Sequence, residues 1–250
     1  TSTDTFNVAI GYNAGAAVTT GVDNVLIGGT TGDALTDADF NVAVGGFALS
    51  ADTLGSKSTA IGEGTLNAQN FTTATDTFNT AVGFQAGKNV TTGIEDTLIG
   101  GLAGDALTTG KENVAVGYRS LSADTQGKRS IAIGKDALRF QNFTTVTETY
   151  NTAVGHAAGE AVTTGTNNVL IGGLAGDALT DADANVAIGK HALGADTLGN
   201  KSIAIGLGAL QTQNFTTATD TFNTAVGHGV GASVTTGRNN TLVGAEAGDA

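Results

Sequence analysis

The stretch Asn7-Val8-Ala9-Ile10-Gly11 decides the fold of this chain, because close variants of it return along the whole sequence. The next copy is Asn24-Val25-Leu26-Ile27-Gly28. The positions of successive closing glycines differ by 17 three times and by 21 the fourth time, and this order repeats as a 72-residue superperiod. Fourteen glycines each close a copy: Gly11, Gly28, Gly45, Gly62, Gly83, Gly100, Gly117, Gly134, Gly155, Gly172, Gly189, Gly206, Gly227 and Gly244.

Repeats of this length, each with one short strand motif, indicate a stacked solenoid. The sequence therefore predicts an all-β chain, a parallel β-solenoid or β-roll of 14 coils whose lengths are the two spacings, 17 and 21. We expect a single repeat domain over residues 1–250, with superperiods at 7–78, 79–150 and 151–222 and a partial one at 223–250. Because the sequence starts just before one copy and stops inside another, we expect it to be a segment of a longer fibre.

Each strand motif is apolar on both faces. The residue before the closing glycine is always Ile or Val, and the residue two positions earlier is Val, Ile or Thr, so these two share one face. The residue between them is Ala or Leu. We expect the Ile/Val column to be buried, so that Ile133→Asp would collapse the stacking. One thin coil can bury only one face, so the other must meet a second layer, most simply another chain. This argument predicts an oligomer.

The rest of each coil carries turn signals. Gly15 and Gly32 stand four residues after a closing glycine, where Leu49 and Leu66 stand in the next two copies. We expect each coil to consist of a strand, a glycine turn, a short second strand and a polar loop. An Asn, Asp or Ser opens each copy, and these side chains should form a ladder of bonds to neighbouring backbone.

The fourth coil of each superperiod holds a four-residue insertion, which we expect to project as a longer loop. It contains paired aromatic residues. Two hypotheses stay open for them: the rings fold back over the edge of the coil, or Phe71, Phe143 and Phe215 form a row of exposed surface contacts for carbohydrate or lateral packing. The pairs are Phe71 with Phe78, Phe143 with Tyr150, and Phe215 with Phe222.

Composition restricts the function. The net charge of −12 disfavours direct binding of nucleic acid or of an anionic membrane. No Cys is present, and no apolar run is long enough to span a bilayer, so we expect no thiolate site and no membrane insertion in this segment. His156 and His228 occupy a position that holds Tyr12 and Phe84 in earlier copies, which does not suggest ligands. The Asp residues lack the dense repeat of calcium solenoids, and no nucleophile, base and acid recur together. We predict no metal, no cofactor and no catalysis.

The run from Thr163 to Gly176, Thr-Thr-Gly-x-x-Asn-Val-Leu-Ile-Gly-Gly-x-x-Gly, resembles repeats of phage tail fibres and of large bacterial surface proteins that end in an intramolecular chaperone. The core motif is also similar to the head repeats of trimeric autotransporter adhesins, although the adhesin coil is shorter. The resemblance covers essentially the whole chain. It implies an intertwined or side-by-side homotrimer that serves as a fibre shaft or an adhesive head.

These observations together favour a structural fibre that attaches to a host or surface, most simply a segment of a phage tail fibre at the virion surface. The alternatives are a bacterial trimeric adhesin or extracellular surface filament, and an ice-binding solenoid, which the many Thr residues suggest. The expected partners are two further copies of the chain and a host-surface glycan or receptor. An attached coiled-coil stalk and membrane anchor would favour the adhesin, and thermal hysteresis would favour the ice-binding protein.

Overall fold

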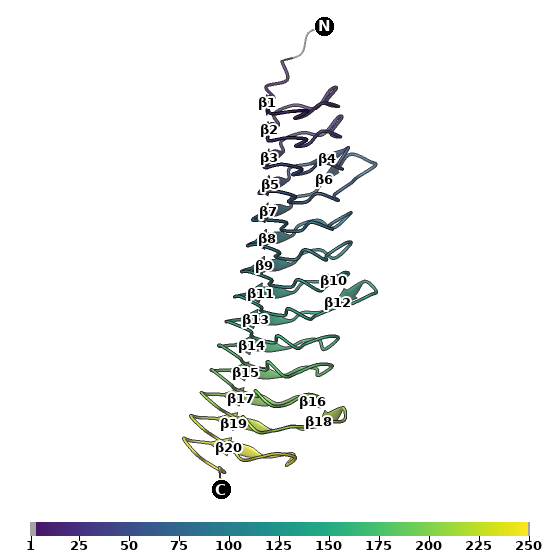
Figure 1. Ribbon diagram of the computed structural model, residues 1–250. Helices are drawn as coiled ribbons and strands as arrows, with labels where there is room; N and C mark the ends of the chain where they lie inside the picture. The colour runs from purple at the N-terminus through teal and green to yellow at the C-terminus, as the bar shows by residue number, and fades with distance from the viewer. Residues whose placement is uncertain (1–3, 250) are drawn as a thin grey trace. The chain divides into compact units, whose positions relative to one another are not determined.

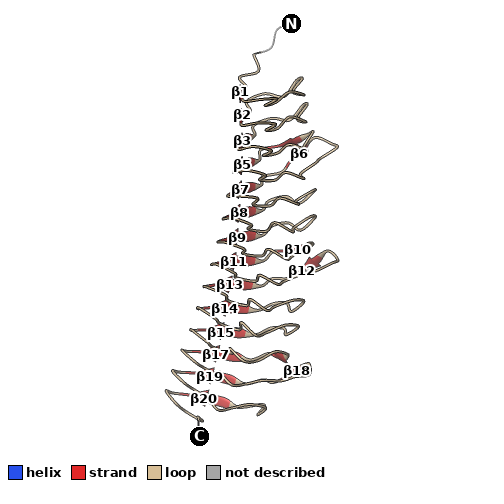
Figure 2. Ribbon diagram, in the orientation of Figure 1, coloured by secondary structure: helices blue, strands red, loops and turns tan. Residues whose placement is uncertain are grey.

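The computed structural model describes residues 4–249. Within these residues the chain is all β and has no helix. It forms a parallel β-solenoid of about fourteen turns, which divides into two compact units, Thr1–Arg119 and Ser120–Ala250. In both units the three-residue strands lie on one side of the coil, a few two-residue strands lie on the other side, and turns and loops make up the rest (Figures 1 and 2). The predicted parallel solenoid is therefore confirmed, whereas a single domain stays a prediction.

The N-terminal unit stacks seven three-residue strands, one from each copy of the motif, among its described residues. Neighbouring strands pair in parallel without any slip in register, so that Val42 lies opposite Thr59, and Val44 opposite Ile61. The strands, in stacking order, are β1 (Val8–Ile10), β2 (Val25–Ile27), β3 (Val42–Val44), β5 (Thr59–Ile61), β7 (Thr80–Val82), β8 (Thr97–Ile99) and β9 (Val114–Val116). A second, two-stranded sheet pairs β4 (Gly55–Ser56) with β6 (Thr75–Asp76).

The C-terminal unit repeats this plan within its described residues. Its seven three-residue strands, in stacking order, are β11 (Ile131–Ile133), β13 (Thr152–Val154), β14 (Val169–Ile171), β15 (Val186–Ile188), β17 (Ile203–Ile205), β19 (Thr224–Val226) and β20 (Thr241–Val243). Two small sheets pair β10 (Gly127–Lys128) with β12 (Thr147–Glu148), and β16 (Gly199–Asn200) with β18 (Thr219–Asp220). A second strand thus forms only where the third coil meets the inserted one. Elsewhere in the described residues, the expected second strand is replaced by turns.

The inward face of the strands is the Ala/Leu column. Leu26, Ala43 and Leu98 are at most 1% exposed, whereas Ile99 and Ile133 on the other face are each 38% exposed. The predicted burial of the Ile/Val column is therefore wrong for a single chain. The interior of one coil is thin, and it is filled by the Ala or Leu of the strand together with apolar residues from the turns, such as Leu35.

The residue that opens each motif explains why this face points inward. The side-chain amide of Asn24 donates to the carbonyl of Ala38, 2.7 Å away and 14 residues further along the same coil. Its carbonyl oxygen accepts from the backbone N–H of Asn41 in the next coil, 3.0 Å away. Because side chains alternate along a strand, an inward Asn24 also turns Leu26 inward. The predicted polar ladder is present, and it selects the buried face.

The inserted coil replaces one rung of this ladder with a buried network. Ser58 opens its motif and is shorter than the Asn of other coils. The Gln69 amide nitrogen donates to Ser58 Oγ, 2.9 Å away, and to Asp52 Oδ2, 2.5 Å away. Its amide oxygen accepts from the Asn79 side chain at 2.9 Å. The insertion therefore delivers a Gln that bridges the rungs above and below it. Equivalent networks surround Gln141 and Gln213.

We expect Gln141→Ala to destabilise the fold by about 2–3 kcal/mol, because it removes buried hydrogen bonds to Asp124, Ser130 and Asn151. Burial raises the pKa of Asp124, while the hydrogen bond from Gln141 lowers it. A raised pKa favours the protonated carboxyl in the folded state, so this group's contribution to stability is complete below its unfolded pKa and is lost as the pH rises through the folded pKa. Because the Gln141 bond favours the charged carboxylate, the loss in the variant should be largest at neutral pH.

Urea unfolding at several pH values checks this prediction. Asn142→Ala is the matched control, because Asn142 is the exposed neighbour of Gln141 and its side chain accepts one bond of 3.3 Å from Thr125. The control should lose less than about 1 kcal/mol. Equal losses in the two variants would mean that the buried network does not hold the inserted coil.

Candidate interaction surface

Each unit exposes one apolar face, which consists of the outward side chains of its three-residue strands. We call it the outer face. Each strand contributes two residues to it, and neighbouring strands lie about 4.8 Å apart, so β-branched side chains stand directly beside one another. In the N-terminal unit they are Val8, Ile10, Val25, Ile27, Val42, Val44, Thr59, Ile61, Thr80, Val82, Thr97, Ile99, Val114 and Val116. In the C-terminal unit they are Ile131, Ile133, Thr152, Val154, Val169, Ile171, Val186, Ile188, Ile203, Ile205, Thr224, Val226, Thr241 and Val243.

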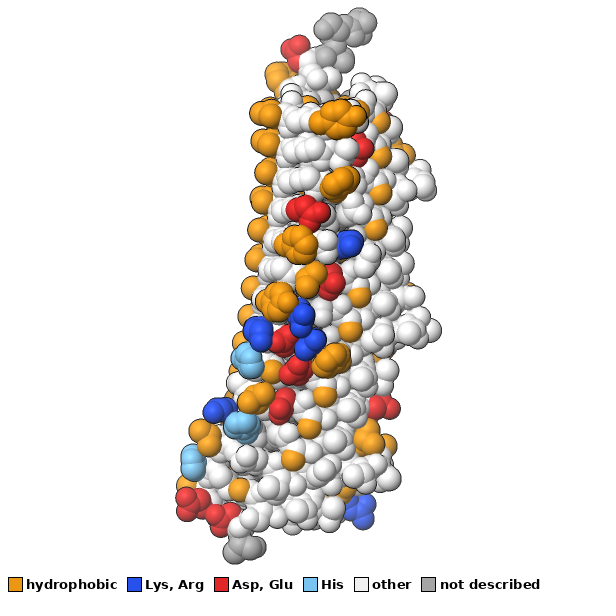
Figure 3. Space-filling view, viewed as in Figure 1, with side chains coloured by type: hydrophobic (Ala, Val, Ile, Leu, Met, Phe, Trp, Pro, Cys, Tyr) orange, Lys and Arg blue, Asp and Glu red, His pale blue; other side chains and the backbone are white. Residues whose placement is uncertain are grey.

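The exposure of these side chains shows what the chain leaves uncovered. Ile61, Ile99 and Ile171 are each 38% exposed, although the strands on both sides cover their flanks. No described part of their own unit lies over their tips. Figure 3 shows the resulting column of hydrophobic side chains along the strand edge of the N-terminal unit. Soluble monomers rarely leave a contiguous apolar surface of this extent, which is the usual mark of an interaction site.

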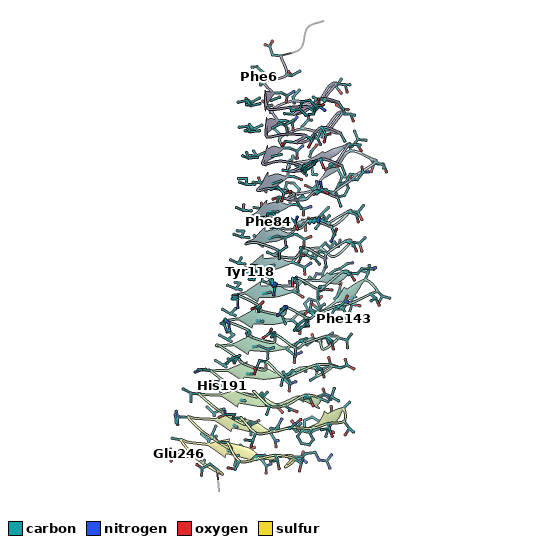
Figure 4. All side chains as sticks on the ribbon, in the orientation of Figure 1. Phe6, Phe84, Tyr118, Phe143, His191 and Glu246 are labelled. Carbon is teal, nitrogen blue, oxygen red and sulfur yellow. The ribbon has the colours of Figure 1, made fainter. Side chains whose placement is uncertain are left out.

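Two rows of residues border the outer face. The leading rim is the residue just before each opening Asn, Asp or Ser, and it includes Phe6, Phe40 and Phe78. The trailing rim is the residue just after each closing glycine, and it includes Tyr12 and Phe84. These rings are between 52% and 78% exposed. Figure 4 shows Phe6 and Phe84 at the strand edge of their unit. Among the described residues, the exposed large apolar side chains outside the outer face and its rims are Phe47, Phe140 and Val146.

The leading rim has an unusual backbone conformation. Phe40 and Lys57 have φ angles of 59° and 63°, in the left-handed region that most side chains avoid. The equivalent residues of the other coils share this conformation, whatever their type, so the corner belongs to the coil itself. Lys57 makes an ion pair of 2.5 Å with Asp76, and its ammonium lies 5.3 Å from the centre of the Phe78 ring. The rim is therefore a mixture of rings and charges held in fixed positions.

The structure does not place the predicted contact residues on the surface. Phe71, Phe143 and Phe215 are each 7% exposed, so the hypothesis of an exposed row is wrong for these three rings in the single chain. The backbone explains their position, because the N–H of Phe71 donates to the buried carboxylate of Asp52 at 3.0 Å and holds the residue against the coil. The residues that follow, 72–74, are exposed instead. The other aromatic residue of each pair, such as Phe78, lies on the leading rim.

The polar residues weighed in the sequence have structural partners. The carboxylate of Asp39 accepts from the backbone N–H of Val22 at 2.8 Å, and that of Asp37 accepts from the hydroxyl of Thr20 at 2.5 Å. Burial raises the pKa of Asp105 and of Asp177, on turns away from the strands. Within residues 4–249 there is no cluster of three or more potential metal ligands and no cavity. No helix of these residues could cross a membrane.

The comparisons with known proteins add no relative of this chain. No protein-family model matches it, no curated protein matches it, and no solved structure matches it. The resemblance of its motif to fibre and adhesin repeats therefore remains a resemblance, and the outer face and its rims are the features from which a function can be argued.

Proposed function

We propose that the chain is a segment of a structural fibre that attaches to a host or surface, and that it assembles as a homotrimer through the outer face. A phage tail fibre at the virion surface is the preferred parent, and a bacterial trimeric adhesin or extracellular surface filament is the alternative. The observation that carries the proposal is the uncovered column of β-branched side chains along each unit. In a free chain such a column stays exposed to water, whereas in an assembly the outer face of another copy covers it and forms the second layer of the core.

Packing energetics support self-association. An Ile or Val side chain contributes about 1.5–3 kcal/mol when it is fully buried, so covering the exposed third of Ile99 adds on the order of 0.5–1 kcal/mol. The gain repeats at every coil because the coils are alike. A second copy is the simplest cover, since it presents the same face with the same spacing between strands.

The inward side of the coil suits a shaft. Its core repeats from coil to coil, with Ala or Leu from the strand, apolar turn residues and the Asn ladder, so the stack can be extended by further coils. The proposed 72-residue superperiod then places one inserted loop in every fourth coil. An extracellular or virion-surface location, the absence of catalysis and contact with a host glycan or receptor remain predictions that go with this proposal.

We expect the paired substitution Ile61→Asp and Ile99→Asp to dissociate the assembly into single chains that keep their fold. Both side chains are on the outer face, so four oxygens in place of two apolar tips would oppose association without entering the core. Light scattering gives the mass, and circular dichroism reports the β structure. Thr92→Asp is the control, since Thr92 is exposed in the loop between β7 and β8. Equal masses for the wild type and the paired variant would contradict the proposed role of the outer face.

A further inference from the structure

The two rims of the outer face correspond to each other in several coils of the N-terminal unit. Phe6 and Tyr12 border the same strand, and so do Phe78 and Phe84. In the coil of β3, the leading rim carries Phe40 and the trailing rim carries Gly46, so this coil makes no ring-to-ring match. All these rings are exposed by 52% or more.

In the N-terminal unit, charged residues on the two rims of one coil are also complementary or at least not of like sign. In the coil of β5, the leading rim carries Lys57 and the trailing rim carries Glu63, and both side chains are exposed. Where the leading rim carries Asp23 or Glu95, the residue after the closing glycine is a second glycine, so like charges do not oppose each other. In the coil of β9, the leading rim carries a carboxylate, Glu112, and the trailing rim carries Tyr118, whose hydroxyl is a hydrogen-bond donor.

The matched residues cannot meet within one chain. Phe78 and Phe84 stand at opposite ends of strand β7 (Thr80–Val82), which places them on the order of 15–20 Å apart. The same separation applies to Lys57 and Glu63 at the two ends of β5 (Thr59–Ile61). A correspondence that has no contact to make inside the chain points to a contact with another copy.

We propose that copies of this chain pack side by side with their coils parallel and at the same height, so that the leading rim of each copy contacts the trailing rim of the next. This inference rests on the proposed function and specifies how the trimer closes. A rotation axis parallel to the coil stack keeps each coil at its own height. It brings unlike rims together in a heterologous contact that closes into a ring. An antiparallel arrangement would place rings against rims of unrelated coils.

In the C-terminal unit, the two rims carry matching residues in two coils and like charges in one. Tyr150 corresponds to His156, and Phe222 corresponds to His228, so flat rings again share a level. The coil of β11 departs from the pairing, because its rims carry two cations, Arg129 and Lys135. The Asp136 carboxylate lies 3.0 Å from the Lys135 ammonium and offsets this charge within the chain. The remaining coils of this unit set at most one charge at a level, so they oppose no pairing of the rims.

Disulfide cross-linking tests the rim contact, because the chain has no Cys of its own. A chain with Phe78→Cys and Phe84→Cys cannot close a disulfide internally, since the two Cα atoms of a disulfide lie within about 7 Å. Both positions are more than half exposed, so the fold should tolerate the change, and the melting temperature under reducing conditions checks this. After oxidation we expect most of the chains to migrate as a closed covalent trimer on a non-reducing gel.

Three controls make the outcome specific. Phe78→Cys alone and Phe84→Cys alone should stay uncross-linked, because each rim faces the unlike rim. Tyr12→Cys with Phe78→Cys should also fail, since these positions lie four coils apart, or about 19 Å. Cross-linking of a single variant, or a product that stops at two copies, would overturn the proposed closure. No cross-link in a chain whose mass is that of a trimer would overturn the rim contact and leave the proposed function intact. A monomeric mass would overturn both.

Discussion

Gly100→Ala is expected to destabilise the N-terminal unit by at least about 3 kcal/mol. A Cβ atom at Gly100 would lie 2.6 Å from the carbonyl oxygen of Gly117 in the next coil, which is backbone and cannot move aside. The φ angle of 132° at this position is also one that residues with a side chain rarely adopt. Chemical unfolding followed by circular dichroism measures the effect.

The adjacent residue supplies the matched control. A Cβ atom at Gly101 would meet only the Tyr118 ring at 3.6 Å and the Phe84 carbonyl oxygen at 4.0 Å, which are ordinary contacts. Gly101→Ala should therefore change the stability by less than about 0.5 kcal/mol. If Gly100→Ala were as stable as Gly101→Ala, the close approach of the glycine column would not be what fixes the coil spacing.

Leu98→Ala is expected to cost about 2–5 kcal/mol, because Leu98 is completely buried in a core that is one side chain thick. Its two methyl groups occupy the space that side chains at Gly87 and Gly104 would need. A Cβ atom at either glycine would lie 2.7 or 2.8 Å from a Leu98 methyl group. In the coil of β9 the large and small residues are exchanged: the strand carries the small Ala115, and the large Leu121 stands where the coil of β8 has Gly104. Equilibrium unfolding in urea measures the loss.

A double-mutant cycle tests this exchange of small and large residues. Gly104→Ala should destabilise the wild type, since its methyl group collides with Leu98. It should cost less in a chain that already carries Leu98→Ala, and the difference is the coupling between the two sites. Strictly additive effects would contradict direct packing between residues 98 and 104.

Much of the fold follows from the spacing of the motif. Because every copy closes on a glycine at a fixed distance, stacking the copies in parallel fixes the register, and Val42 falls opposite Thr59 as the alignment of motifs predicts. The Gly-to-Leu exchange four residues after the closing glycine was also visible. The reason for this exchange was not visible in the sequence. The backbone conformation does not explain it, because both Gly32 and Leu49 adopt positive φ angles, at 54° and 51°. The choice between them depends on whether Leu26 or Ala43 fills the interior beside them.

The inward face could not be read from hydrophobicity, because Ile and Val are more apolar than Ala. The decisive signal was that the opening residue lies two positions before the Ala or Leu of the strand, so both side chains point to the same face. Asn24 can reach the carbonyl of Ala38 only from inside the coil, and Leu26 shares its face. Ile27 must then point outward. The predicted contact residue Phe71 could not be recognised as buried for a related reason. In the structure its backbone N–H bonds to the Asp52 carboxylate, which holds Phe71 against the coil and leaves Phe78 exposed on the leading rim.

The mass of the unmodified chain in solution tests the central claim, that the outer face is an interface between copies, most directly. One chain has a mass of 24.6 kDa, and light scattering should give three times this value at concentrations where the circular dichroism spectrum is that of a folded β protein. A folded chain that scatters as a single copy at all concentrations would show that the outer face remains open to water, and it would contradict the proposed assembly.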